Sequence, residues 1–216
     1  MEANLAPAGN PAEAIYSNSF LREILLSLRF VAGPSYGAIL HEAGLDPYRD
    51  ALPPSDSQLT VTADTITRLF SGGYTHLAPP QAMLFFNYMG EHLANVTWER
   101  PELQNVVPEI GALAPGARVV TAWKRLIEFV NRDAHLRRRV VSDDRNDYLI
   151  LENCPYCQGI HNAPRPVCFA TVRYYEVLLL RLTGRAVVVR ELECHATGHN
   201  RCVFAVRRER GLSGTQ

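Results

Sequence analysis

Five cysteines in the last third of this 216-residue chain carry its most specific chemistry. They are Cys154, Cys157, Cys168, Cys194 and Cys202, and no cysteine precedes them. Thiolates are favoured ligands of Zn²⁺, and clustering of this kind is typical of a local metal site. An odd number of cysteines fits a full disulfide framework poorly. The spacing therefore predicts one metal site attached to an otherwise thiol-free domain.

Two local elements are expected to position the last three cysteines. A helix predicted over residues 166–182 has Pro166 and Cys168 in its first turn, where the helix dipole and the free N–H groups favour a thiolate. Strands predicted over 186–193 and 202–207 are joined by the turn HATGHN. A hairpin of this kind brings the end of one strand beside the start of the next, and the helix N-terminus can pack over both.

The spacing C-x22-E-x2-C-x7-C adds a carboxylate to these thiols. Glu191 and Cys194 lie at the end of the first strand, and Cys202 begins the next. Together with Cys168 they offer thiolate and carboxylate ligands in the number that a closed, structural zinc site uses. A Zn²⁺ ion there would lock the terminal hairpin to the helix, and its binding energy would add to folding.

Other ligand sets are open on spacing alone. The C-x-x-C pair Cys154 and Cys157 is a strong zinc-knuckle signal, and with Cys194 and Cys202 it would make a four-cysteine site that leaves Cys168 in the core. Small buried cysteines without metal are a further alternative. If the set with the carboxylate binds the metal, the C-x-x-C pair is left as a redox pair, a second ligand set or a tight turn. Loop histidines are more often solvated, but candidate substitutes near the cluster are His161, His195 and His199.

Charge and hydropathy exclude several classes of protein. Lys and Arg number 22 and Asp and Glu number 22, so the chain lacks the basic excess of a general nucleic-acid or membrane-surface binder. No uninterrupted apolar run reaches the ~18 residues of a membrane span. The N-terminal sequence MEANLAPAGNPAEA does not have the pattern of a secretory signal. We therefore expect a cytoplasmic protein with no membrane span and no direct nucleic-acid partner.

The order of predicted elements indicates an α+β fold. Helical periodicity dominates the first two-thirds of the chain, and two strands, a long helix and two more strands follow. A helical layer must then cover one face of a four-stranded antiparallel sheet. We expect a single domain over residues 15–208, with disordered tails over 1–14 and 209–216.

Aromatic side chains on the predicted helices are candidates for an apolar ligand pocket. Trp123, Phe86 and Tyr174 are our choices, although at helical spacing such residues more often belong to the core. The sequence has no Gly-rich phosphate loop, no G-x-G-x-x-G and no H-E-x-x-H. These observations favour a binding module over a catalyst, and no catalytic residue is assigned.

Residues 164–206 resemble the 4-vinyl reductase domain family. The resemblance lies in PVCF at 166–169 and LTGRAVVVRELECHATGHNRCVF at 182–204, where the pattern E-x-x-C-x-x-x-G-x-x-x-C-x-F is complete. The spacing is also similar to the zinc site of the aromatic-sensing domains of phenol-responsive transcription activators. What the resemblance implies is a structural Zn²⁺ held by Cys168, Glu191, Cys194 and Cys202, with Cys154 and Cys157 as the alternative metal or redox pair.

The resemblance is weaker over residues 17–163, in NSFLREILLSL, HEAGL and the LPP loop. It implies a fold like the small subunits of the vesicle-tethering TRAPP complex, a bacterial source and a homodimer. The implied function is the binding of a hydrophobic, aromatic or tetrapyrrole ligand as a sensor or carrier. The alternatives are a protein of bacteriochlorophyll 4-vinyl reductase type in tetrapyrrole biosynthesis, or a TRAPP-like scaffold subunit.

Overall fold

The computed structural model describes residues 14–132 and 138–208. The tails expected over 1–14 and 209–216 therefore lie outside the described residues, except for Ala14, which begins the first strand. The N-terminal part is a helical layer with a small two-stranded antiparallel sheet. Its elements are β1 (Ala14–Ser17), α1 (Asn18–Ala32), η2 (Gly33–Ser35), α2 (Tyr36–Glu42), η3 (Asp46–Tyr48), β2 (Leu59–Thr62), α3 (Ala63–His76) and α4 (Pro79–Trp98).

The C-terminal part holds a four-stranded antiparallel sheet of order β3-β4-β6-β5. Helices precede it and α8 interrupts it, so the expected α+β class is confirmed. The elements of this part are α5 (Pro101–Gln104), α6 (Val107–Ala112), α7 (Pro115–Arg132), β3 (Arg138–Ser142), β4 (Asn146–Leu151), α8 (Phe169–Thr183), β5 (Val189–Glu193), η4 (His195–Thr197) and β6 (Cys202–Arg207).

Local sequence explains where the first helices begin and end. The Ser17 hydroxyl accepts a hydrogen bond from the Phe20 N–H, and Thr62 caps α3 in the same way through the Thr65 N–H. Gly33 ends α1 at φ 49°, a conformation that a side chain would strain. The periodicity thus predicts these helices to within a few residues.

Two features differ from the expectation. Strands β1 and β2 were not predicted, because each is four residues long and their pairing joins segments far apart in the sequence. Helix α8 begins at Phe169, so Cys168 is its N-cap residue and does not lie in the first turn as predicted. The backbone N–H of Cys168 donates to the Glu191 carboxylate on β5, which holds this residue outside the helix.

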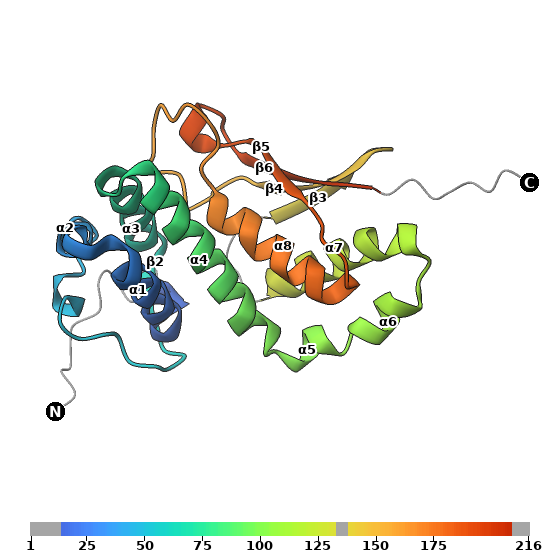
Figure 1. The fold of residues 1–216 in the computed structure, drawn as a ribbon, viewed down its shortest axis with the longest axis horizontal. Coiled ribbons are helices and arrows are strands. Elements are labelled where there is room, and N and C mark those ends of the chain that lie inside the picture. Colours follow the sequence, from blue (N-terminus) through green and yellow to red (C-terminus); the bar gives the residue numbers. More distant parts are fainter. Residues whose placement is uncertain (1–13, 133–137, 209–216) are drawn as a thin grey trace, which may run out of the picture.

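Two hydrophobic clusters fill the interior. One joins α1–α4 and includes Phe70, Phe85 and Phe86. The other lies between α6–α8 and the large sheet, and it contains Trp123 and all five cysteines. Figure 1 shows α4 and α8 side by side between the N-terminal helices and the sheet, and their contact is the most extensive between any two elements.

Glycine 90 allows the close approach of α4 and α8. A Cβ atom built on Gly90 would lie 2.3 Å from the carbonyl oxygen of Ala170, which is backbone and cannot move aside as a side chain would. Ala170 belongs to the first turn of α8. The absence of a side chain at one position therefore sets the distance between the two helices at the start of α8.

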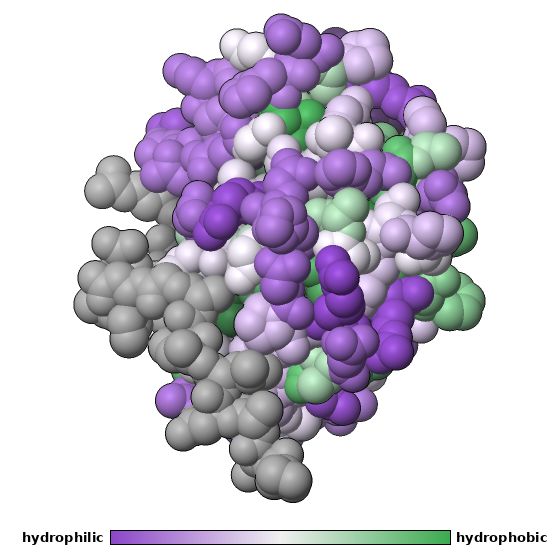
Figure 2. Space-filling model, turned by 90° about the vertical axis from the view of Figure 1, so that its left-hand side faces the viewer, coloured by the Kyte–Doolittle hydropathy of each residue, from purple (hydrophilic) through white to green (hydrophobic). Residues whose placement is uncertain are grey.

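One segment, Asn18–Glu42, is long and apolar enough by composition to cross a membrane. Half of it is buried inside the fold and Gly33 interrupts its helix, as in a core segment of a soluble protein, so this is weak evidence for a span. Figure 2 shows the molecule from the side of the N-terminal helices. Its visible surface is mainly hydrophilic, with small scattered apolar patches.

We predict that Gly90→Ala destabilises the protein by about 1–3 kcal/mol, because the added methyl group forces α4 away from α8. Gly111→Ala in α6 is the matched control, since a Cβ atom there meets nothing within 4 Å. That change should leave stability within about 1 kcal/mol of the original, or raise it slightly. Urea unfolding of both variants checks the prediction, and equal midpoints for the two would contradict it.

Candidate functional site

All five cysteine sulfur atoms gather in one buried cluster. The Sγ atoms of Cys154 and Cys168 are 3.7 Å apart, and those of Cys157 and Cys202 are 3.3 Å apart. The Sγ atom of Cys168 is 4.0 Å from that of Cys194 and 4.0 Å from that of Cys202. Every one of these cysteines is at most 2% exposed. The C-x-x-C pair therefore belongs to the same cluster as the other three thiols.

Four segments bring the cluster together. Cys154 and Cys157 lie in the loop after β4, and Cys168 precedes α8. Cys194 follows β5, and Cys202 begins β6, where it pairs with the last residue of β4. The hairpin ends therefore meet the start of α8, as the sequence predicts.

Hydrogen bonds and an ion pair hold the segments that carry these thiols. Ser71 of α3 donates to the carbonyl oxygen of Gly159 in the cysteine-rich loop (2.9 Å), and Arg201 pairs with Glu193 across the hairpin. The Ala163 N–H donates to the carbonyl oxygen of Ala196 at 2.9 Å, which ties the same loop to the β5–β6 turn. The loop is thus attached both to the helical layer and to the sheet.

Glu191 supplies a carboxylate at the same place. One oxygen, Oε2, accepts a hydrogen bond from the Cys168 N–H at 2.8 Å. The other, Oε1, is buried and has no hydrogen-bond partner among the described residues. Burial raises the pKa of Glu191 to about 9. A buried, unpaired carboxylate oxygen is costly, and a bound cation would satisfy it.

Two sets of four donors can each hold a metal ion, because their ligand atoms all lie within 4.8 Å of one another. One set is Cys168, Glu191, Cys194 and Cys202, and the other is Cys154, Cys157, Cys168 and Cys202. Tetrahedral Zn²⁺ with Zn–S bonds of about 2.3 Å separates its sulfur ligands by about 3.8 Å. The observed sulfur separations are close to this value, so the residues fit zinc.

The histidines and the alternative four-cysteine set differ from this arrangement. The compact set that contains the C-x-x-C pair uses Cys168, whereas the spacing alone suggested Cys194. Neither set includes a histidine within the described residues. His161 and His199 are exposed, and His195 Nε2 lies 3.0 Å from the carbonyl oxygen of Glu152.

Hydrogen bonds among the thiols favour the ionised form of two of them. The neighbouring thiols, Cys157 foremost, lower the pKa of Cys194 to about 6, and those led by Cys154 lower the pKa of Cys202 to about 6. The same contacts, with burial, raise the pKa of Cys168 well above its usual value. The cluster therefore offers thiolates at neutral pH, which is the form that binds metal.

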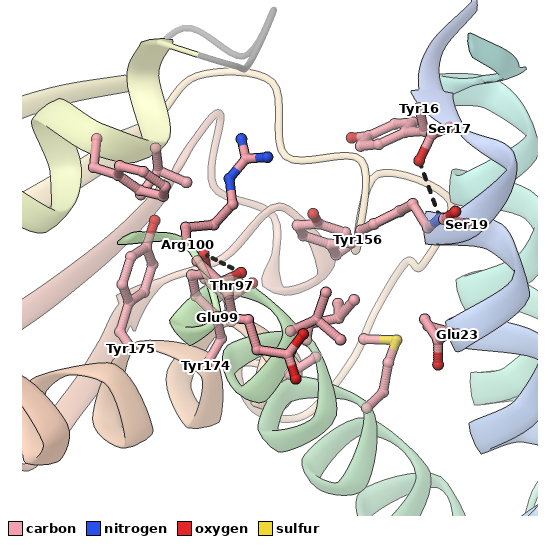
Figure 3. A pocket seen from close by; sticks show the side chains of 18 of the residues that line it. Tyr16, Ser17, Ser19, Glu23, Thr97, Glu99, Arg100, Tyr156, Tyr174 and Tyr175 are labelled. Atoms are coloured by element: carbon pink, nitrogen blue, oxygen red, sulfur yellow. Dashed lines mark hydrogen bonds between the residues drawn. The ribbon is translucent and has the colours of Figure 1, made fainter. Parts of the chain in front are cut away.

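A cavity of about 710 Å³ lies beside the cluster. Figure 3 shows Tyr174 and Tyr175 of α8 on one side, Tyr156 of the cysteine-rich loop in the middle and residues at the start of α1 on the other side. Its lining is mostly aromatic and aliphatic, with Met89, Leu93, Phe129 and Leu151 among the apolar residues. The cavity lies in the size range of small-molecule sites.

Three buried polar atoms that line this cavity have no hydrogen-bond partner among the described residues. They are the Tyr16 hydroxyl, the Thr171 hydroxyl and Nε of Arg138. Arg138 is held by a hydrogen bond from its Nη1 to the carbonyl oxygen of Val130 at 2.8 Å. Buried polar groups in folded proteins are normally paired, so these atoms indicate a polar group of a bound molecule or ordered water.

The tyrosines of the cavity stay neutral near pH 7. Burial raises the pKa of Tyr16 to about 12 and raises the pKa values of Tyr156 and Tyr175, and the positive charge of Arg138 only partly opposes it. Tyr174 donates a hydrogen bond to the Thr97 hydroxyl at 3.2 Å. The cavity thus has neutral hydroxyl groups and a fixed guanidinium within an apolar wall.

The sequence-predicted pocket residues are distributed differently. Tyr174 lines the cavity, whereas Trp123 and Phe86 are buried in the two hydrophobic clusters and are not part of its lining. Trp123 contacts the cavity indirectly, because its ring packs edge-on against Tyr175. Sequence reasoning did not identify Tyr16 or Arg138, since both lie outside the predicted helices.

Tyr156 was the one additional residue with a local signal. It lies between the two cysteines of the C-x-x-C pair, so its place beside the metal ligands was visible in the sequence. Its ring packs against Phe70 of the helical layer at a centroid distance of 4.9 Å. A residue of the thiol loop therefore forms part of the cavity wall.

The comparison with family models agrees with the chemistry of this region. Residues 147–208 match the model of the 4-vinyl reductase domain. The C-terminal segment is therefore a domain of this family, and the resemblance stated from the sequence is confirmed there. No curated protein matches the chain.

Solved structures are similar to the whole fold at low sequence identity. The Fe(II) unliganded H-NOX protein from K. algicida has a TM-score of 0.52 and 9% identity, over 92% of this chain and 100% of that chain. A mutant of that protein has a TM-score of 0.53 and 10% identity, over 91% of this chain and 98% of its own. At such identities the likeness shows the fold alone.

The phenol-responsive sensory domain of the transcription activator PoxR, solved with phenol, is also similar. Its TM-score is 0.45 and its identity is 16%, over 68% of this chain and 75% of that chain. At this score the likeness places no residue of that domain on this chain.

We predict that added zinc raises the melting temperature of the protein and that Cys168→Ala abolishes the effect, because Cys168 belongs to both ligand sets. A hundredfold excess of zinc over its dissociation constant should stabilise the native state by about 3 kcal/mol. Thr183→Ala, at the opposite end of α8, is the control. Its buried hydroxyl bonds only to backbone groups, so the variant should be less stable yet still respond to zinc. A zinc response in Cys168→Ala equal to that of the original protein would rule out this site.

Proposed function

We propose that this protein binds a small aromatic molecule bearing a hydroxyl or carboxylate group, and that it acts as a sensor or carrier. The observation that carries the proposal is the set of three unpaired polar atoms on Tyr16, Arg138 and Thr171 in a largely apolar cavity. An aromatic ring would fill the apolar part, and its polar group would satisfy these atoms. The match to the 4-vinyl reductase domain supports a small-molecule-binding domain.

Structural zinc is the second part of the proposal. Cys168, Glu191, Cys194 and Cys202 would hold the ion, and when bound it supplies a rigid, closed link between α8 and the β5–β6 hairpin. The buried Glu191 oxygen supports this ligand set. The link matters for the cavity because α8 provides Thr171, Tyr174 and Tyr175.

The remaining expectations stay predictions from the sequence and its resemblance. These are a single domain over residues 15–208, a homodimer, a bacterial source and a cytoplasmic location. A tetrapyrrole ligand and a TRAPP-like scaffold role are the competing functions. The ligand test below separates both from the proposal.

The test is calorimetric titration with phenol, benzoate, toluene and protoporphyrin. We expect phenol and benzoate to bind more tightly than toluene, because toluene leaves the polar atoms unpaired. Arg138→Gln should weaken benzoate binding about tenfold, or about 1.4 kcal/mol. The control is Arg139→Gln, since Arg139 is the neighbouring residue on β3 but is exposed and lies near Glu152 (3.9 Å). It should bind benzoate as the original protein does.

Three outcomes would contradict the proposal. Equal affinity for toluene and phenol would show that the unpaired polar atoms do not select the ligand. Binding of protoporphyrin alone would favour the tetrapyrrole function. Binding of none of the four compounds would favour a scaffold role.

A further inference from the structure

The cluster contains more donors than one zinc ion uses. Five thiols and the Glu191 carboxylate surround the site, whereas a structural zinc ion takes four ligands. Filling the set with Glu191 leaves Cys154 and Cys157 buried without metal. Filling the set with the C-x-x-C pair leaves Cys194 and Glu191 buried, and Glu191 then keeps an unpaired oxygen.

The two sets overlap in a way that permits both to be filled. They share Cys168 and Cys202, whose sulfur atoms are 4.0 Å apart. Two tetrahedra that share one edge place their centres on opposite sides of that edge. Each set then adds its own pair of terminal ligands, Cys154 and Cys157 in one and Glu191 and Cys194 in the other.

We propose that the cluster binds two divalent cations of the zinc type, one in each set, with the thiolates of Cys168 and Cys202 bridging them. The close contacts support shared ligands. Cys154 lies 3.7 Å from Cys168 and Cys157 lies 3.3 Å from Cys202, so both members of the C-x-x-C pair touch a bridging sulfur. On the other side Cys194 is 4.0 Å from Cys168.

Charge is consistent with two cations. Five thiolates and one carboxylate carry six negative charges, and two dications reduce this to a net charge of minus two. That is the same net charge as a single zinc ion with four thiolates, which is a common structural site. One dication with all six groups ionised would leave minus four in a buried place, which is much less favourable.

The same distances exclude an iron–sulfur cluster at this place. The cysteine sulfur atoms are 3.3–4.0 Å apart, close to van der Waals contact, and leave no room for inorganic sulfide between them. Thiolate-rich tetrahedral sites select zinc and similar soft ions. The second ion would attach the C-x-x-C loop, and with it Tyr156, to α8 and β6.

This inference rests on the proposed zinc site for its first ion, but it does not depend on a ligand in the cavity. The test is native mass spectrometry of the full chain after equilibration with excess zinc and removal of weakly bound ions. We expect two ions in the original protein. Removing terminal ligands should cost one ion, in Cys154→Ala/Cys157→Ala and equally in Glu191→Gln/Cys194→Ala.

A bridging residue should behave differently from a terminal one. Cys168→Ala should lose both ions, because it removes one ligand from each set. His161→Ala/His199→Ala is the control for adventitious surface binding and should retain both ions. Circular dichroism spectra establish that each variant is folded before its ions are counted.

Cobalt substitution tests the bridge without any mutation. Titration of the metal-free protein with Co²⁺ should give sulfur-to-cobalt absorption up to two equivalents, with a lower magnetic moment per ion after the second because shared thiolates couple the two ions. Two ions without this coupling would overturn the bridge.

Ion counting separates failure of this inference from failure of the proposed function. A single ion in the original protein that persists in Cys154→Ala/Cys157→Ala and is lost in Glu191→Gln/Cys194→Ala would overturn the second site and leave the proposed zinc site standing. A second ion lost only in the histidine variant would also overturn it. No ion in the original protein would overturn both.

Discussion

The close approach of α4 and α8 at Gly90 is the constraint on which the site depends. A side chain at this position would collide with the carbonyl oxygen of Ala170, so α8 has one possible distance from the helical layer. Ala170 is two residues after Cys168 and next to Thr171, whose hydroxyl lines the cavity. The position of the first turn of α8 therefore sets both the placement of one metal ligand and the width of the cavity. Overpacking at one glycine would disturb both, since cores transmit strain.

The thiol cluster and the cavity share walls. Tyr156 lies between two cysteines of the cluster and faces the cavity, and Leu151 lines the cavity while its strand neighbour is Cys202. Without a cation the cluster leaves a buried carboxylate oxygen unpaired. With a cation, the binding energy stabilises the packing of α8, the hairpin and the loop, which are the same segments that shape the cavity. A rigid metal site beside a cavity is thus a way to keep the cavity open and of constant shape.

Sequence reasoning reached the parts of this arrangement that local chemistry determines. The helix that follows Cys168 and the hairpin between Glu191 and Cys202 have clear patterns, and these predicted that the residues meet. The cluster also includes Cys154 and Cys157, but a loop has no periodicity, so the spacing could not show which thiols they approach. Tyr16 and Arg138 are brought to the cavity by long-range packing, and the pairing of β1 with β2 has no local signal at all. Contacts between distant segments are the part that the sequence alone did not supply.

Shared walls also make the two kinds of binding interdependent. If a cation in the cluster fixes Tyr156 and the first turn of α8, a molecule in the cavity meets walls that are already ordered and loses less conformational entropy on binding. The coupling free energy is reciprocal, so a ligand that binds the ordered cavity more tightly must raise the affinity for the cation by the same factor. The cluster would then be more than a brace for the fold. Its occupancy and that of the cavity would report on each other, because Thr171 and Cys168 lie within the same turn of backbone.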